Sequence, residues 1–187
     1  MNKNGKLFII SAPSGACKTS VTMKVIEKLK KIIPIKKVIT YTTRPPRPGE
    51  INGIDYHFIS TQDFLKNKSA GFFLETTNYA NSFYGSTSYI INDLKNGQSF
   101  VIVTDMAGAK NFKKNIMPDA VTIWITVSDV QELRKRLEKR VDPKEVIEKR
   151  LKLALEESAL EAKEKTFNKK IKEQIMDYKT LTDEQLQ

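Results

Sequence analysis

Short apolar runs alternate along this chain with stretches in which apolar residues recur every three or four positions. The runs at 7–10 and 100–104 consist almost entirely of Leu, Ile, Val and Phe, and a further strand is predicted at 119–127. Unbroken apolar runs are typical of parallel strands that are covered on both faces. Because helical stretches separate them, the pattern predicts an α/β fold.

The first helical stretch is predicted at 19–31 and ends before Pro34, since proline cannot continue a helix. Its apolar face is expected to consist of Val21, Val25, Ile26 and Leu29. A second helix is predicted at 88–94, and Gly97 follows it as a stop signal.

Two more helices are predicted, one on each side of the break at Val141–Pro143. The first presents Val130, Leu133 and Leu137, and the second presents Val146, Ile147, Leu151 and Leu155. Beyond Lys163 the chain is highly charged. There Ile171 and Ile175 indicate one last element, and the end from Thr180 is expected to be loosely held.

The segment from 40 to 88 interrupts this pattern because it is rich in predicted β-structure. Its parts are expected to be a strand at 37–41, a proline-rich loop at 42–50, a hairpin at 51–59 turning at Asn52-Gly53, a short helix after a cap at Ser60–Asp63, a strand at 72–76 and a loop at 81–87. We therefore expect a small β-rich insertion within one α/β domain.

Composition narrows the class of protein. The 187 residues, 40% hydrophobic and 29% charged, suit one globular domain. No apolar run approaches the roughly 20 residues that span a bilayer, so no membrane association is expected, and the first run is too short for a signal peptide. The single cysteine cannot form an internal disulfide, which favours a cytoplasmic protein.

The net charge of +10 has two interpretations. It could serve a polyanionic ligand, either a nucleotide or a nucleic acid, or it could be a lysine-rich solvated surface. Nucleic-acid binding is disfavoured because the basic stretches lack interleaved aromatic residues. Charge alone does not decide between a nucleotide ligand and a solvated surface.

The stretch from Ser11 to Ser20 has the layout of a phosphate-binding P-loop, because a strand leads into it and Lys18-Thr19 opens a helix. Such a loop offers backbone N–H groups and a lysine to phosphates. The ATP-binding residues are predicted to be Ala12, Pro13, Ser14, Gly15, Ala16, Cys17, Lys18, Thr19 and Ser20. Ala12 and Cys17 stand where the motif has glycine. If Cys17 needs a positive φ, the cost is about 1–2 kcal/mol.

Other candidate residues lie at loops and strand ends. Arg44 and Arg47 sit on a proline-stiffened loop that suits a bidentate phosphate clamp, although an ordinary polar loop is the alternative. Asp105 follows the strongest strand, at the edge where α/β folds bind ligands. His57, the one histidine, alternates with aromatic residues and is interpreted as structural rather than catalytic.

The chain resembles the guanylate kinases over about its first 155 residues. The run from Thr42 to Glu50, followed by Asn52-Gly53, Tyr56 and Phe58, is similar to the signature of that family. Similar family segments are Phe73-Leu74-Glu75, Tyr84-Gly85-Ser86, Leu133–Leu137 with Arg140, and Lys149-Arg150-Leu151.

The resemblance implies a P-loop NTPase-type parallel sheet flanked by helices. It divides the single domain into a core at 1–38 and 89–187, a GMP-binding insertion at 39–88 and a lid at about 138–149. It implies phosphorylation of GMP or dGMP by ATP with Mg²⁺, as monomer or homodimer. Phosphoryl transfer needs positioning and charge neutralisation rather than a strong base, so the lack of a candidate His or Cys agrees with it.

The resemblance also implies roles for individual residues. The GMP phosphate would bind Arg44, Arg47, Tyr56 and Tyr84, and the guanosine would bind Thr40, Glu75, Ser86 and Asp105. Glu75 suits guanine because a carboxylate accepts from both N1–H and the exocyclic amine, a donor pair that adenine lacks. Lys18 and Thr19 would serve the ATP phosphates and Mg²⁺. The residues expected around the transferred phosphoryl group are Lys18, Arg44, Arg136, Arg140 and Arg150, although the last three could instead form a solvated helix face.

Four departures from the family pattern fall on the ATP, metal or lid side. They are Cys17, the Val103-Thr104-Asp105 strand end, Arg140-Val141 and Glu173-Gln174. Their clustering leaves a second hypothesis open, a guanylate-kinase-like module that binds GMP or a protein partner without efficient transfer. We expect Cys17→Gly to raise activity or ATP affinity, because glycine adopts a left-handed conformation freely.

Overall fold

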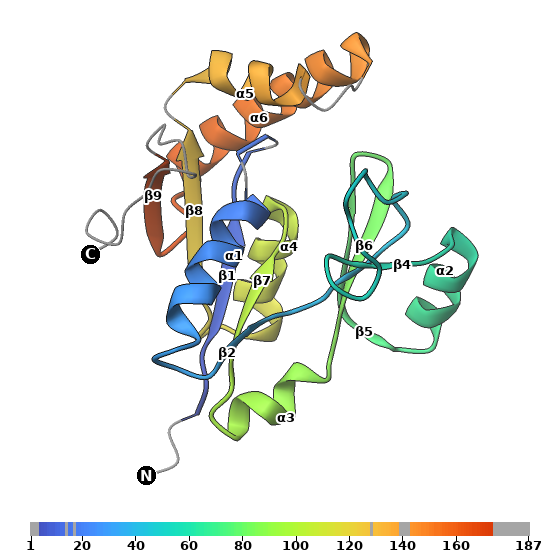
Figure 1. Cartoon of the computed structure of the whole chain (residues 1–187), viewed down its shortest axis with the longest axis vertical. Helices are drawn as coiled ribbons and strands as arrows, with labels where there is room; N and C mark the ends of the chain where they lie inside the picture. The colour runs from blue at the N-terminus through green and yellow to red at the C-terminus, as the bar shows by residue number, and fades with distance from the viewer. Residues whose placement is uncertain (1–3, 14, 17, 128, 139–142, 174–187) are drawn as a thin grey trace.

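The fold contains two β-sheets, which lie side by side (Figure 1). It is known from a computed structural model that describes residues 4–13, 15–16, 18–127, 129–138 and 143–173. Cys17 and Arg140 therefore lie outside the described residues, as do Ser14 and most of the link between the two helices around Pro143.

The larger sheet has five strands in the order β2-β7-β1-β8-β9, and every pairing in it is parallel. The strands are β1 (Leu7–Ser11), β2 (Ile35–Lys37), β7 (Ser99–Val103), β8 (Val121–Val127) and β9 (Lys169–Glu173). The predicted α/β class and its parallel sheet are confirmed.

Successive apolar residues of these strands point to opposite faces of the sheet. Ile10 and Val101 pack against α1 (Lys18–Leu29), α5 (Val130–Glu138) and α6 (Lys144–Glu164). Ile9 and Ile102 pack against α3 (Ile90–Lys95), α4 (Met106–Asn111) and the π-helical turn η1 (Phe112–Ile116). Both faces are covered, which explains why these strands lack polar alternation.

The smaller sheet has the order β4-β3-β6-β5 and lies within residues 41–87. Its elements are β3 (Tyr41–Thr42), β4 (His57–Phe58), α2 (Thr61–Ser69), β5 (Phe73–Tyr79) and β6 (Ser82–Thr87). Helix α2 starts at the predicted cap, where the Ser60 hydroxyl accepts from the Asp63 N–H. Its buried Phe64 stacks between Phe73 and Phe83, so this part has an aromatic core of its own.

Three predictions within this β-rich part are wrong. The strand expected at 37–41 is divided, because β2 ends at Lys37 and β3 begins at Tyr41 in the other sheet. The hairpin expected at 51–59 is instead a turn followed by β4, which pairs with β3 in parallel. The loop expected at 81–87 is strand β6, whose hydroxyl residues pair with β5.

The helices differ from the prediction in smaller ways. Val25 is exposed, and the buried face of α1 is formed by Thr22 and Ile26. Helix α4 and η1 were not predicted at all. The element indicated by Ile171 is strand β9, where the Asn168 amide oxygen accepts from both the N–H and the hydroxyl of Thr122. Among the described residues, no helix combines the length and apolar character that crossing a bilayer requires.

Candidate active site

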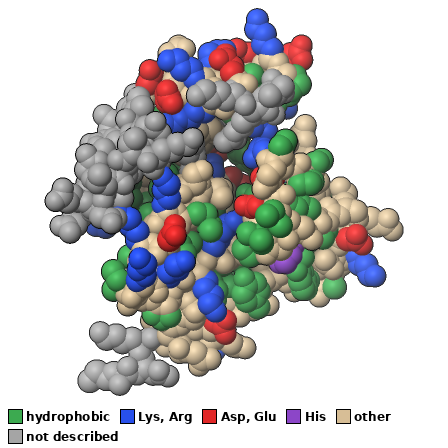
Figure 2. All heavy atoms as spheres, in the orientation of Figure 1, with side chains coloured by type: hydrophobic (Ala, Val, Ile, Leu, Met, Phe, Trp, Pro, Cys, Tyr) green, Lys and Arg blue, Asp and Glu red, His purple; other side chains and the backbone are tan. Residues whose placement is uncertain are grey.

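One cavity of about 270 Å³ is bordered by both sheet-containing parts and by Arg150 of α6. Figure 2 shows the hollow between the two parts, with acidic and basic side chains inside it. Residues of the P-loop region, the β-rich part and α6 all line it. Of the predicted site residues, those that line it are Gly15, Ala16, Lys18, Thr19, Ser20, Thr40, Arg44, Arg47, Tyr56, Glu75, Tyr84, Ser86, Asp105 and Arg150.

The other predicted residues lie elsewhere. Ala12 and Pro13 are buried behind the cavity wall. Arg136 is not among the lining residues, and its guanidinium Nε donates to Glu132 Oε1 at 2.9 Å, one turn back on α5. The predictions for Ser14, Cys17 and Arg140 fall outside the described residues.

The P-loop is packed beneath the two helices that follow β8. Ala12 and Ala16 belong to the same buried cluster as Leu151 and Ala154 of α6. Gly15 has a φ of +89°, which glycine adopts more easily than other residues. A Cβ there would also lie only 3.2 Å from the Leu133 side chain, so a larger residue would be crowded. Lys18 opens α1, and its ammonium donates to the Ala12 carbonyl at 2.6 Å.

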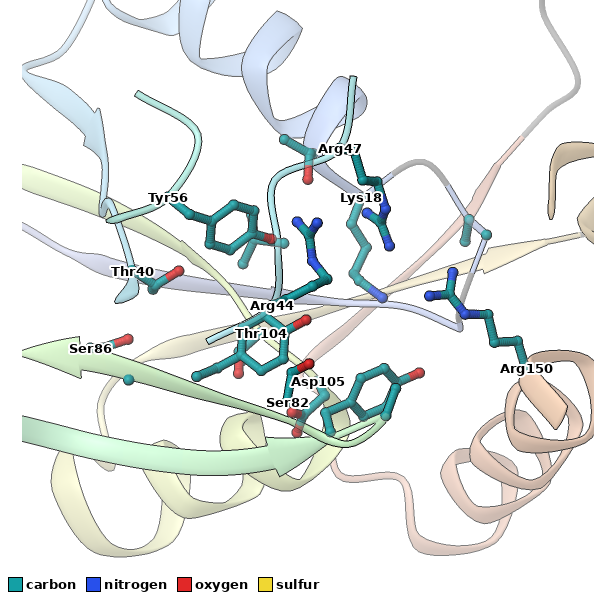
Figure 3. A pocket seen from close by; sticks show the side chains of 18 of the residues that line it. Lys18, Thr40, Arg44, Arg47, Tyr56, Ser82, Ser86, Thr104, Asp105 and Arg150 are labelled. Atoms are coloured by element: carbon teal, nitrogen blue, oxygen red, sulfur yellow. The ribbon is translucent and has the colours of Figure 1, made fainter. Parts of the chain in front are cut away.

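Glu50 organises the proline-rich loop that carries the two arginines. The Nη2 group of Arg44 donates to both oxygens of Glu50, at 2.8 and 2.9 Å. The backbone N–H of Arg47 donates to the same carboxylate at 2.7 Å. Because one carboxylate holds both residues, the Arg44 guanidinium is presented to the cavity with little freedom, and the Arg47 backbone is fixed beside it (Figure 3).

Two tyrosines complete this side of the cavity. The Tyr56 ring lies 5.4 Å from the Arg44 guanidinium carbon and 6.2 Å from the Tyr84 ring. Burial raises the pKa of Tyr56, and Tyr84 adds to the increase, so the phenol remains a proton donor at neutral pH. Arginines and phenol groups together offer hydrogen-bond donors to an anion.

The inner end of the cavity is polar but buried. Thr40, Glu75 and Ser86 are each at most 7% exposed, and Glu75 pairs with Ser86 across β5 and β6. The register shifts between Phe73 and Glu75, an irregularity that redirects the strand. Gly85 is needed beside it, since a Cβ there would approach the Phe73 ring to 2.7 Å.

Glu75 is in an unusual electrostatic state. Burial, and then the nearby Asp105, raise its pKa to about 7. Its Oε1 has no hydrogen-bond partner among the described residues. A buried carboxylate without donors is costly, so ligand N–H groups that reach it would be bound favourably.

Asp105 lies where β7 gives way to α4, and its Oδ1 accepts the Gly108 N–H at 2.8 Å as the helix cap. Its neighbours Val103 and Thr104, at the strand end that departs from the family pattern, also line the cavity. Sequence reasoning did not assign them, nor the Tyr79, Ala80, Ser82 and Gly85 that line the cavity from the β5–β6 hairpin.

A second buried carboxylate, Glu157 of α6, was also missed. It is 8% exposed, and its Oε2 has no hydrogen-bond partner among the described residues. Burial raises its pKa to about 7, against the opposing effect of Lys18, and Asp105 adds to the increase. Glu157 follows Arg150 by two helical turns, so it shares the helix face toward the P-loop. The helical spacing of Arg150, Leu151, Ala154 and Glu157 could have indicated in the sequence that Glu157 lies on the buried face.

The parallel sheet, the lysine-bearing loop between β1 and α1 and the mixed basic and acidic cavity define a P-loop protein that binds nucleotides. Residues 4–183 match the family model of guanylate kinases. The chain therefore belongs to the guanylate kinase family, as its motifs had indicated.

Related proteins agree with this assignment. The chain is 40% identical over 161 residues to the guanylate kinase of Coxiella burnetii, covering 85% of this chain and 76% of that one. It is 38% identical to the guanylate kinase of Hydrogenovibrio crunogenus, covering 82% and 74%. The crystal structure of guanylate kinase from Anaplasma phagocytophilum superposes with a TM-score of 0.74 and 28% identity, covering 92% of this chain and 79% of that chain.

Proposed function

We propose that this chain transfers the γ-phosphoryl group of ATP to GMP, giving ADP and GDP. The observation that carries the proposal is that one cavity has Lys18 and Arg150 on one side and Arg44, Tyr56 and Glu75 on the other. Two nucleotides whose phosphates meet in such a space are held for direct transfer.

The GMP phosphate is proposed to bind Arg44, Arg47, Tyr56 and Tyr84. Arg44 is 12% exposed and anchored by Glu50, so its charge is presented without much reorganisation. Guanine is proposed to reach Glu75, with the Thr40 and Ser86 hydroxyls beside it and Asp105 near the ribose. The ionised carboxylate would accept from N1–H and the exocyclic amine of guanine.

In the proposed reaction a GMP phosphate oxygen attacks the γ-phosphorus of ATP. The new P–O bond forms as the bond to the bridging oxygen breaks, and the electron pair leaves with ADP. Negative charge spreads over the transferred group, and fixed cations stabilise it. Lys18 and Arg150 are the described residues proposed for this role, with Arg136 and Arg140 joining if the adjoining helices move.

The site suits Mg²⁺ carried mainly by phosphates. The Thr19 hydroxyl and the Asp105 carboxylate both line the cavity, and these are oxygen donors of the kind Mg²⁺ takes beside phosphates and water. Among the described residues no cluster of three carboxylate, histidine or cysteine ligands exists. When bound, Mg²⁺ neutralises charge on the β- and γ-phosphates.

We further propose that residues 39–88 form a GMP-binding unit and that residues near 138–149 form a lid. The sheet division supports the first, since every strand of the smaller sheet lies within residues 41–87. Placement in the cytoplasm is also proposed, on the ground that both proposed substrates, ATP and GMP, are present there. dGMP is proposed as a second acceptor.

A coupled assay of ADP formation with Mg-ATP and GMP tests the proposal. We expect turnover that depends on GMP and is lost in Arg44→Met, with Lys66→Met on the exposed surface of α2 as the control. No turnover by the unaltered chain, with GMP binding retained in calorimetry, would contradict the proposal and establish a binding module instead.

A further inference from the structure

Lys37 connects the two sheets through its side chain. It is the last residue of β2 at the edge of the core sheet, and the chain then crosses to β3 of the smaller sheet. Its ammonium donates to the backbone carbonyl of Asp55 at 2.8 Å, across the crossing point. Lys37 does not line the cavity, and neither the P-loop nor the family motifs include it.

The turn that Lys37 contacts is otherwise closed on itself. The Asp55 side chain accepts the Ile51 N–H at 2.8 Å, and the Asp55 N–H donates to the Ile51 carbonyl at 3.0 Å. The carbonyl of Asp55 is therefore the group that this turn offers to the core. Residue 56, directly after it, is the tyrosine proposed to bind the GMP phosphate.

Lys37 also contacts the Tyr56 ring. Its ammonium lies 5.5 Å from the ring centroid, and the Arg44 guanidinium carbon lies 5.4 Å from the same centroid. Both are within cation–π range, so two cations from different segments constrain one ring. Burial lowers the pKa of Lys37, while Asp55 and Glu50 oppose the decrease, so the structure keeps a partly desolvated lysine here.

We infer that Lys37 is a positioning residue for GMP binding, which fastens the Tyr56 turn to the core sheet and orients the phenol toward the GMP phosphate. The inference rests on the proposed function. It gives the core sheet a direct part in shaping the acceptor site, through one hydrogen bond and one ring contact. Since both contacts are made with residues on the GMP side of the cavity, removing the ammonium should weaken GMP binding and leave ATP binding unchanged.

The test uses Lys37→Met, which keeps most of the side-chain length and removes the ammonium. We expect KM for GMP to rise about tenfold, as for one lost charge-assisted hydrogen bond, while KM for ATP and kcat change less than about twofold. Lys36→Met is the matched control, because Lys36 is the exposed neighbour on the same strand. Lys37→Arg, which keeps a cation and donors, is expected to recover most of the GMP affinity.

A double-mutant cycle with Tyr56→Phe separates positioning from general destabilisation. If Lys37 acts through the phenol, Lys37→Met adds little once that hydroxyl is gone, so the two effects are not additive. Full additivity, an unchanged KM for GMP in Lys37→Met, or an equal rise in both KM values would overturn the inference. Failure of the proposed function is distinct, because the unaltered chain would then show no GMP-dependent turnover.

Discussion

At the scale of single residues, Glu75 combines a cost in stability with a proposed role in recognition. It is 6% exposed, its Oε1 lacks a partner among the described residues, and its pKa is raised to about 7. Removing its charge should therefore relieve a desolvation cost while abolishing the acceptor pair for guanine.

We predict that Glu75→Gln weakens GMP binding at least about 100-fold, as for a lost pair of hydrogen bonds to a charged group. ATP affinity should change little. In calorimetry, Glu156→Gln on the exposed face of α6 serves as the control and should bind GMP normally. Equal losses of GMP and ATP affinity would show that the guanine assignment is incorrect.

A second prediction at this scale concerns how the stability of the protein depends on pH through the buried carboxyl groups of Glu75 and Glu157. Both pKa values lie near 7 in the folded protein, whereas an exposed Glu has a pKa of 4.5, so the folded state binds more protons between these values. Stability of the nucleotide-free protein should thus fall as pH rises from below 4.5, and the penalty should be complete above about pH 7.

In Glu157→Gln the free energy of unfolding should decrease less between low and high pH. A shift of the Glu157 pKa from 4.5 to about 7 corresponds to about 3 kcal/mol of unfolding free energy. Urea unfolding at about pH 5 and about pH 8 measures it, with Glu156→Gln as the neighbouring control. An identical pH dependence in Glu157→Gln and the unaltered chain would mean that Glu157 is not buried as a proton-binding group.

Several residues of the cavity wall could be singled out from the sequence because the signals that mark them are local. Arg44, Arg47 and Tyr56 lie within a short stretch of sequence, and each lines the cavity. Glu50, Glu157 and Lys37 were not assigned roles, since their contacts depend on segments brought together by the fold. Nothing in the isolated neighbourhood of Lys37 indicates that its ammonium meets the Asp55 carbonyl.

At the scale of elements, α4 approaches β7 and β5 closely through one glycine. A Cβ at Gly108 would lie 2.3 Å from the Thr104 hydroxyl oxygen and 3.4 Å from Glu75 Oε1. This helix thus packs closely behind Thr104 and Glu75, which line the cavity, and its fit depends on the missing side chain.

We predict that Gly108→Ala destabilises the protein by about 1–3 kcal/mol through overpacking against Thr104. Because Thr104 lines the cavity beside Glu75, its displacement should also raise KM for GMP. Adding Thr104→Ala removes the closest atom and should recover much of the stability. Ala107→Ser, at the exposed neighbouring position of α4, is the control. Thermal unfolding and GMP titration measure both effects, and an unaltered KM in Gly108→Ala would contradict the proposed link between Thr104 and the GMP site.

The sequence predicted the strands that are buried on both faces. It did not predict the strands whose existence or direction depends on pairing with a distant segment. Strands β1 and β7 each contain four consecutive apolar residues because both faces of their sheet are covered. Strand β6 is rich in hydroxyl residues and resembles a loop in composition, yet it forms a hairpin with β5 through Ala80 and Asn81, both with positive φ. Residues 52–53 signalled a hairpin turn, but β4 pairs in parallel with β3 instead.

At the scale of the whole molecule, the cavity depends on three separate parts of the chain meeting. The P-loop belongs to the core, Arg44 belongs to the loop between β3 and β4, and Arg150 belongs to α6 (Figure 3). Glu75 on β5 lines the same cavity. The parallel sheet and the family could be predicted from the sequence. The relative placement of the parts could not, because it rests on contacts such as that of Lys37 with Asp55.

The most direct test of the account is the choice of acceptor nucleotide by the unaltered chain. With Mg-ATP in a coupled assay, kcat/KM should decrease in the order GMP, IMP and AMP. IMP keeps N1–H and lacks the exocyclic amine, so we expect a loss of about 10- to 100-fold, whereas AMP lacks the donor pair and should lose at least about 1,000-fold. AMP used within tenfold of GMP would contradict the claim that a buried carboxylate at Glu75 selects guanine.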